Sequence, residues 1–274
     1  MKTDEMENLT GIQAACSNPV AQGAAVLKHG SLFTGIGGFD LAASWMGWEN
    51  VFQCEKNEWC RRVLAKNFQN TKRYIDIKDF NANEYRGSID IISGGFPCQP
   101  FSKAGKQRGK QDDRYLFPQM LRVIREVDPP FIIGENVYGI AKTALQEIKT
   151  SLEDLGYITI AFDIPASAGG ALHRRSRIWI VGIKKDTFDT NTNGIGSYRK
   201  EMHQQGNAEF QYQQIGEFGS VVSESIRKGI DSRIFGNING LSDRVDRIKG
   251  LGNAIVPQVA YEIFKCVGLL AAAP

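Results

Sequence analysis

The chain contains 274 residues, of which 42% are apolar and 23% are charged. This composition is typical of a globular protein with one large core, and it excludes fibrous and intrinsically disordered proteins. The formal net charge of +3 is small, so it allows a nucleic-acid partner without requiring one.

The chain has five cysteines, an odd number, and only three histidines. No two cysteines form a Cys-x-x-Cys pair. We therefore expect reduced thiols in an intracellular, cytoplasmic protein, and no metal site.

Residues 1–25 begin with a charged, mostly acidic stretch, and their apolar patch is interrupted by Gln22 and Gly23. This pattern is neither a signal peptide nor a membrane span. We expect residues 1–25 to form a tail, and we expect no membrane segment.

A strand, a glycine turn and a helix are predicted next. Residues 26–33 have the pattern of a first strand, residues 34–40 contain a Gly-x-Gly-Gly turn, and residues 41–46 begin a helix. Glycines allow positive φ and close approach of a ligand, and the free N–H groups at a helix start favour a polar or anionic group. A tight turn without a ligand has the same pattern, and the third glycine of the dinucleotide-binding fingerprint is absent.

Residues 51–54 predict a second strand that ends at Glu55, and residues 58–68 predict an amphipathic helix. An acidic residue about 20 positions past a glycine turn is placed to hydrogen-bond a ribose diol. We therefore interpret Glu55 as a cofactor carboxylate, although a surface glutamate can occupy such a position by chance. Residues 73–75 predict a third strand.

Cys98 lies in a turn-rich loop, residues 93–102, directly after an apolar run at residues 89–92 that predicts a buried strand. A lone cysteine is most often a small buried apolar residue. Two glycines and two prolines around Cys98 instead end regular structure, and a polar loop, residues 103–114, follows. This context favours a functional thiol at the carboxyl end of a strand.

The loop after Cys98 carries cations interspersed with glycines at residues 103–110. Such a run is usually a solvated loop. Beside a candidate nucleophile it can instead close over a polyanion and exclude water. The next helix is predicted to open at Arg114 and Leu116 and to continue to Val127.

Residues 131–134 predict another buried strand, which brings Glu135 to the same sheet edge as the reactive loop. Glu135 is either a strand-end surface charge or a site group. A helix over residues 142–155 and a strand over residues 157–164 continue the alternation. We therefore expect βαβ units and a mostly parallel sheet.

A basic cluster at residues 173–177 precedes a predicted strand at residues 178–181. Such a cluster before a buried strand indicates anionic partners, unless acidic side chains elsewhere pair with it. Residues 184–241 are rich in Asn, Gln, Gly and Ser and poor in apolar periodicity, which predicts a second lobe or a long insertion. An apolar helix is predicted at residues 258–270.

Several of these segments, in this order, resemble the motifs of the cytosine-C5 methyltransferases. The resemblance is carried by Leu-Phe-Thr-Gly-Ile-Gly-Gly at 32–38, Pro-Cys-Gln-Pro-Phe-Ser at 97–102, Glu-Asn-Val at 135–137, the arginine cluster at 173–177, the arginine pair at 244 and 247, and Gly-Asn-Ala-Ile-Val-Pro at 252–257. Ser31 stands where the family usually has an acidic residue, and His173 replaces the family's glutamine.

The resemblance covers about residues 30–267, and it implies an α/β fold with a Rossmann-like, S-adenosylmethionine-dependent methyltransferase sheet and a short target-recognition lobe. The implied divisions are an N-terminal tail at 1–25, a catalytic and cofactor-binding domain at 26–183, a short target-recognition region at 184–243 and a C-terminal segment at 244–274 that returns to the catalytic domain.

The resemblance also implies a set of site residues. The catalytic residues would be Cys98, Glu135, Arg175 and Arg177. The cofactor S-adenosylmethionine would contact Phe33, Gly35, Ile36, Gly37, Gly38, Glu55, Asp76, Ile77, Pro97, Leu116, Asn253 and Ala254. Duplex DNA would contact Ser102, Lys103, Lys106, Arg108, Arg114, Arg244 and Arg247.

The implied reaction is transfer of a methyl group from S-adenosylmethionine to C5 of cytosine in duplex DNA. Because C5 is a weak nucleophile, Cys98 would first add to C6, with Arg175 favouring the thiolate and Glu135 binding or protonating N3. The base would be rotated out of the stack, and Arg177 would bind phosphates. We expect a bacterial or phage-encoded monomer that associates with the nucleoid, with a cognate restriction endonuclease as one candidate partner.

Three other functions fit parts of the sequence. An RNA cytosine methyltransferase would share the fold, but the Cys-Phe-Thr signature typical of the tRNA-acting branch is absent. A catalytically silent DNA-binding relative would be expected to lack Cys98, Glu135 or Arg175, and all three are present. A nicotinamide oxidoreductase would need the third glycine of its fingerprint.

Overall fold

The structure is a computed structural model that describes residues 26–97, 115–165, 176–188 and 254–272. The predicted tail and nearly all of the predicted target-recognition region lie outside these ranges. Among the described residues, no helix is both long enough and apolar enough to cross a membrane.

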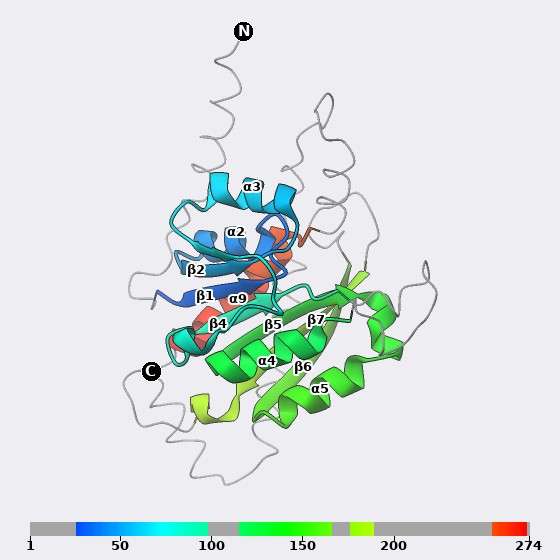
Figure 1. Cartoon of the computed structure of the whole chain (residues 1–274). Coiled ribbons are helices and arrows are strands. Elements are labelled where there is room, and N and C mark those ends of the chain that lie inside the picture. The colour runs from blue at the N-terminus through cyan, green and yellow to red at the C-terminus, as the bar shows by residue number, and fades with distance from the viewer. Residues whose placement is uncertain (1–25, 98–114, 166–175, 189–253, 273–274) are drawn as a thin grey trace.

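Seven strands form one sheet in the order β3-β2-β1-β4-β5-β7-β6 (Figure 1). Their bounds are Lys28–Leu32 (β1), Glu49–Cys54 (β2), Lys72–Tyr74 (β3), Ile91–Gly94 (β4), Phe131–Val137 (β5), Tyr157–Pro165 (β6) and Ser176–Lys184 (β7). All of β4 and the first six residues of β5 are buried, as expected for central strands that helices cover on both faces.

Strands β1 to β5 pair in parallel, whereas β7 is antiparallel to both of its neighbours, β5 and β6. Only residues 166–175 join β6 to β7, and this link is too short for the helical crossover that parallel neighbours need. The prediction of a mostly parallel sheet is confirmed. The predicted boundary of the last strand was wrong, because β7 begins at Ser176 and so contains Arg177.

Helices cover both faces of the sheet (Figure 1). Helices α2 (Gly38–Trp45) and α9 (Pro257–Ala272) lie on one face, and α4 (Phe117–Val127) and α5 (Leu145–Glu153) lie on the other. Helix α3 (Glu58–Asn67) begins after Asn57, whose side chain accepts a hydrogen bond from Cys60 N at 3.0 Å. The short 3-10 helices are Asn83–Tyr85 (η1), Tyr138–Lys142 (η4) and Lys185–Phe188 (η6).

Each face has its own apolar core. Helix α4 buries Met120, Val123, Ile124 and Val127, whose spacing of three and four residues forms one helical stripe. On the other face, the ring of Phe264 in α9 stacks on Trp48 at a centroid distance of 4.9 Å. Helix α9, near the end of the described chain, therefore completes a core that also contains residues from near its start.

Gly38, the first residue of α2, lies against the segment that leads into α9. A Cβ at Gly38 would lie 2.8 Å from both Cβ and the carbonyl oxygen of Ile255. We expect Gly38→Ala to lower the free energy of unfolding by about 1–3 kcal/mol, because backbone cannot move aside as a flexible side chain does. Urea denaturation followed by circular dichroism measures this change.

Gly268→Ala in α9 is a matched control. Its added Cβ would meet the flexible end of Met46 at 3.2 Å and the ring of Trp48 at 3.6 Å, which is an ordinary van der Waals distance. Alanine also favours a helix by up to about 1 kcal/mol. We expect an unchanged or slightly higher stability. Equal losses in the two variants would contradict the close contact between Gly38 and Ile255.

Candidate active site

The carboxyl ends of the parallel strands meet along one edge of the sheet. Leu32 at the end of β1 pairs with Cys54 of β2 and with Gly94 of β4, and Gly94 pairs with Gly134 of β5. On one side of the β1–β4 pair the sheet continues with β2 and then β3, and on the other side it continues with β5. This pair is therefore the topological switch point, where open α/β sheets bind their ligands.

The glycine turn after β1 has three residues with positive φ: Phe33 at 51°, Gly35 at 59° and Gly37 at 92°. A non-glycine residue in this region is uncommon, and such strain persists only where the surroundings hold it. The turn is closed by a hydrogen bond from Gly37 N to the Thr34 carbonyl at 3.0 Å. Among the described residues, no atom lies within 4 Å of a Cβ built at Gly35, so none of them closes the turn on that side.

Glu55 follows β2 and lies against the glycine turn. One carboxylate oxygen accepts a hydrogen bond from Gly35 N at 2.7 Å, and the other accepts one from Asn57 N at 2.7 Å. Gly35 and Glu55, which follow the neighbouring strands β1 and β2, are therefore in direct contact.

Asp76 follows β3 on the same side of the sheet. Its carboxylate forms an ion pair with Lys56 at 2.7 Å and accepts a hydrogen bond from Lys78 N at 3.0 Å. The hydrogen bond from Lys56 is the main cause that lowers the pKa of Asp76. The neighbouring Ile77 side chain is buried. This contact of Lys56 was not predicted from the sequence.

The base of the Cys98 loop is held by two hydrogen bonds. The side-chain amide of Asn136 donates to the Phe96 carbonyl at 2.8 Å, and Leu116 N donates to the Pro97 carbonyl at 3.4 Å. The two ends of the loop are therefore side by side, next to the end of β5. This contact of Asn136 was not predicted from the sequence, although an asparagine in a buried strand is itself a signal of a polar contact.

Glu135 and Arg177 form a buried ion pair across β5 and β7, with 2.9 Å between Arg177 Nε and Glu135 Oε1. Glu135 is only 8% exposed, and burial raises its pKa to about 7 even though Arg177 opposes the rise. Burial also lowers the pKa of Arg177. A carboxyl group with this pKa can donate or accept a proton near neutral pH.

A small pocket opens beside this ion pair. Its walls are formed by Glu135, Ile164, Arg177, Trp179, Ala254, Val256 and Val259. The predicted cofactor residue Ala254 therefore lies in the same pocket as the predicted catalytic carboxyl. Ile255, between two of these wall residues, contacts the glycine turn through Gly38.

The sequence profile of the C-5 cytosine-specific DNA methylases matches residues 27–234. The chain belongs to the C-5 cytosine-specific DNA methylase family. The strand order with its antiparallel β7 is thus the Rossmann-like methyltransferase sheet that the sequence analysis predicted, and that prediction is confirmed.

Several curated proteins are similar to this chain over part of their length. Type II methyltransferase M.PspPI from Psychrobacter sp. (strain TA137) is 36% identical over 165 residues, covering 58% of this chain and 40% of that protein. Type II methyltransferase M.HhaI from Haemophilus parahaemolyticus is 34% identical over 165 residues, covering 58% of this chain and 50% of that protein. The chain spans about half the length of the curated relatives it matches.

Among solved structures, the Dnmt2 methyltransferase of S. pombe has the same fold, with a TM-score of 0.57 and 18% identity. The superposition covers 89% of this chain and 98% of that chain. The similarity in fold therefore extends well beyond the segment aligned with M.PspPI and M.HhaI.

The structure brings part of the predicted methylase site together. The glycine turn, Glu55, Pro97, Glu135 and Arg177 lie along the edge described above. The predicted residues outside the described ranges are Cys98, Arg175, Asn253 and all seven DNA-binding residues. Arg177, predicted to bind phosphate, pairs with Glu135, and its contact with DNA stays a prediction.

Three of the other cysteines are buried thiols: Cys54, Cys60 and Cys266. Burial raises the pKa of Cys54 to about 12 and the pKa of Cys266 to about 11. Neither thiol can readily form the thiolate that acts as a nucleophile. No group of three or more metal-binding side chains occurs among the described residues.

The raised pKa of Glu135 predicts how stability depends on pH. The group ordinarily titrates near 4.5 and titrates near 7 in the fold, so the folded protein binds this proton more tightly than the unfolded chain. The stabilising contribution is present below pH 4.5 and is lost as the pH rises through about 7. We expect the melting temperature of Glu135→Gln to rise relative to wild type between about pH 5 and about pH 8.

Thermal melts of both proteins in buffers of equal ionic strength measure this difference. A difference that stays constant with pH, or that changes in the opposite direction, would contradict the raised pKa of Glu135.

Proposed function

We propose that the chain transfers a methyl group from S-adenosylmethionine to C5 of cytosine in duplex DNA. The observation that carries the proposal is the buried Glu135–Arg177 pair beside the base of the Cys98 loop, on the edge that also holds the glycine turn. Membership of the C-5 cytosine-specific DNA methylase family supports the same reaction.

The residues of the glycine turn fit S-adenosylmethionine. An added Cβ at Gly35 would meet no atom of the described part of the chain within 4 Å, and Glu55 already accepts a hydrogen bond from Gly35 N. Glu55 would bind the ribose hydroxyls, Asp76 would bind the adenine amino group, and the turn would allow close approach of the amino-acid end. S-adenosylmethionine, when bound, supplies the methyl group.

Cys98 supplies the nucleophile that activates cytosine. Its thiolate forms a bond to C6, and the electrons of the C5–C6 double bond shift toward C5 and the ring nitrogen N3. Glu135, protonated in part at neutral pH, donates a proton to N3 and so stabilises the electron-rich ring. Once C5 is methylated, water accepts the C5 proton as Cys98 departs as a thiolate, and Glu135 takes back the N3 proton, which restores the aromatic ring.

Arginines would control the protonation of these groups. We assign to Arg175 the stabilisation of the Cys98 thiolate, as an adjacent cation lowers the pKa of a thiol. Arg177 holds the Glu135 carboxyl in place through its 2.9 Å ion pair. Without Arg177, burial alone would raise the pKa of Glu135 further.

Duplex DNA would enter the site by base flipping, since the reacting atoms of cytosine are inaccessible in the stack. The predicted DNA-binding cations would neutralise phosphates. Binding should therefore weaken steeply as salt concentration rises. The names of the relatives, Type II methyltransferases, support a role in restriction and modification with a companion endonuclease, on bacterial DNA in the cytoplasm.

A methyl-transfer assay with the full chain tests the proposal. The chain is incubated with radiolabelled S-adenosylmethionine and unmethylated bacterial genomic DNA, and the product nucleosides are separated by chromatography. We expect the label in 5-methylcytosine from DNA. A parallel reaction contains tRNA in place of DNA. Incorporation of label into tRNA but not into DNA would indicate the RNA-methylating alternative. Incorporation into neither nucleic acid would overturn the proposal.

A further inference from the structure

We propose that Arg122 in α4 is a positioning residue for the cofactor site, because it fixes the turn that carries Asp76. The inference rests on the function proposed above, which assigns Asp76 to the adenine end of S-adenosylmethionine. Arg122 itself lies on the face of the sheet covered by α4, and the hydrogen bonds of its guanidinium join α4 to the segment that follows β3.

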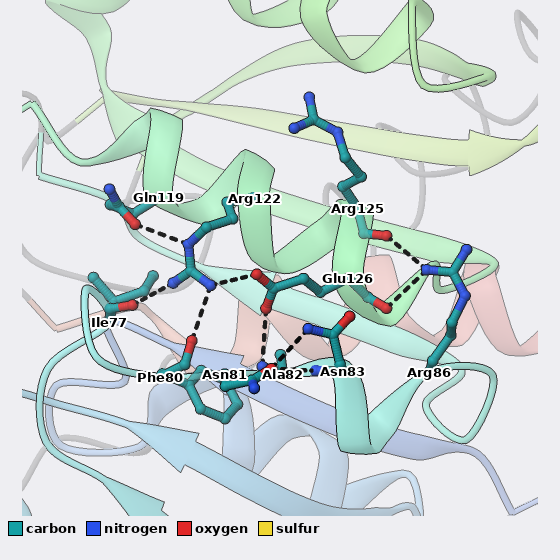
Figure 2. A network of polar contacts seen from close by, with 10 residues as sticks. All are labelled: Ile77, Phe80, Asn81, Ala82, Asn83, Arg86, Gln119, Arg122, Arg125 and Glu126. Carbon is teal, nitrogen blue, oxygen red and sulfur yellow. Dashed lines mark hydrogen bonds and ion pairs between the residues drawn. The ribbon is translucent and has the colours of Figure 1, made fainter.

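Arg122 binds two carbonyl groups of the segment that follows β3 (Figure 2). One guanidinium nitrogen donates to the Ile77 carbonyl at 2.5 Å, and another donates to the Phe80 carbonyl at 2.9 Å. The guanidinium is aimed by two neighbours on α4. Its Nε donates to Gln119 at 3.0 Å, and Nη1 pairs with Glu126 at 2.6 Å.

Glu126 adds one more hydrogen bond between α4 and the segment that follows β3. Its second carboxylate oxygen accepts a hydrogen bond from Ala82 N at 2.9 Å. The pair of Arg122 and Glu126 thus ties three backbone groups between residues 77 and 82 to one helix. Their side chains are only 30% and 18% exposed, so these bonds are partly shielded from water.

The position of the Asp76 carboxylate depends on this segment. Asp76 opens a turn in which Asp79 N donates to the Asp76 carbonyl at 3.1 Å and Lys78 N donates to the carboxylate at 3.0 Å. Ile77, the residue inside that turn, is the one whose carbonyl Arg122 binds. Release of this carbonyl would free the turn and the carboxylate that it orients.

Helix α4 also begins at the base of the Cys98 loop. Leu116, its N-cap residue, donates its N–H to the Pro97 carbonyl. Arg122 lies about one and a half turns further along the same helix. One rigid element therefore sets the position of the Asp76 turn relative to the loop that carries the nucleophile.

Arg86 provides a matched control, since it joins the same two segments without touching the Asp76 turn. Its guanidinium donates to the carbonyls of Arg125 and Glu126, each at 3.1 Å. Figure 2 places Arg86 at the opposite end of the network from Ile77. A purely structural role for the network predicts similar consequences from loss of either arginine.

The test compares Arg122→Met with Arg86→Met in the full chain. Isothermal titration calorimetry with S-adenosylhomocysteine measures cofactor-site affinity, and thermal melts measure stability. We expect Arg122→Met to weaken binding roughly tenfold or more, as displaced binding groups commonly do, and Arg86→Met to change it by less than about twofold. The KM for S-adenosylmethionine should rise in Arg122→Met while the KM for DNA stays unchanged.

Arg122→Lys is a second variant, which keeps the inference testable if Arg122→Met does not fold. Lysine keeps the charge beside Glu126 but cannot reach both carbonyls with a planar fork. We expect affinity between that of wild type and Arg122→Met, with a melting temperature close to wild type.

Two outcomes would overturn the inference about Arg122 alone. They are wild-type affinity in Arg122→Met and Arg122→Lys, or an equal loss of affinity in Arg86→Met. A wild-type chain that does not bind S-adenosylhomocysteine would overturn the proposed cofactor site, and the inference with it.

Discussion

Cys98→Ala is expected to abolish methyl transfer to DNA. Without the sulfur, no bond forms at C6 of cytosine, and C5 stays too electron-poor to accept a methyl group. Loss of a covalent nucleophile commonly costs a factor of roughly 10⁴ or more in kcat. Incorporation of radiolabelled methyl groups into DNA under single-turnover conditions measures the loss.

Cys266→Ala is the matched control for this experiment. Cys266 is a buried thiol of α9, and it lies outside the proposed reaction. We expect wild-type kcat in Cys266→Ala and retained S-adenosylhomocysteine binding in Cys98→Ala. Methyl transfer by Cys98→Ala at a rate near that of wild type would rule out the covalent mechanism.

Glu135→Gln is expected to reduce kcat by roughly 10²–10⁴, the range typical for loss of a general acid. Glutamine preserves the size of the side chain but has no proton to give to N3 at neutral pH. In the wild type, kcat should fall as the pH rises through about 7, where Glu135 loses its proton. That fall should be absent from the residual activity of Glu135→Gln.

Glu58→Gln on α3 serves as a control, because the Glu58 side chain is 76% exposed and pairs with Arg62 on the helix surface. We expect its kcat and pH profile to match the wild type. A Glu135→Gln variant with more than about a tenth of wild-type kcat would exclude general acid catalysis by Glu135.

Much of the fold could be predicted from local sequence patterns. The apolar runs before Glu55, Cys98 and Glu135 indicated strands. In the structure, β2 ends directly before Glu55, β4 ends at Gly94 ahead of Cys98, and β5 extends beyond the predicted run to include Glu135. Such runs are reliable because a buried parallel strand must be apolar on both faces. The glycine turn was predicted for a comparable reason, since Gly37 adopts a backbone conformation that other residues rarely accept.

Contacts between distant segments could not be predicted in this way. The ion pair of Glu135 and Arg177 depends on β7 running antiparallel to β5, and strand direction is set by the length of the connection rather than by the strand's own residues. The predicted strand began too late because Arg177 is polar and lies outside the apolar run. In the structure, Arg177 pairs with Val137 in the sheet.

Polar residues inside helices were equally hard to interpret. On the sequence alone, Arg122 reads as an ordinary surface residue of an amphipathic helix. Its carbonyl partners, Ile77 and Phe80, lie more than 40 positions earlier in the chain. Backbone carbonyls carry no sequence signal, so only the tertiary structure identifies such a contact.

The packing of α9 has a consequence for how the chain matures on the ribosome. Its apolar residues Val259, Ile263, Phe264 and Val267 are fully buried against elements synthesised much earlier. Until α9 emerges from the exit tunnel, the face that includes Trp48 lacks the cover that α9 provides. We therefore expect chaperones to bind the apolar face that α9 later covers, before α9 has been synthesised.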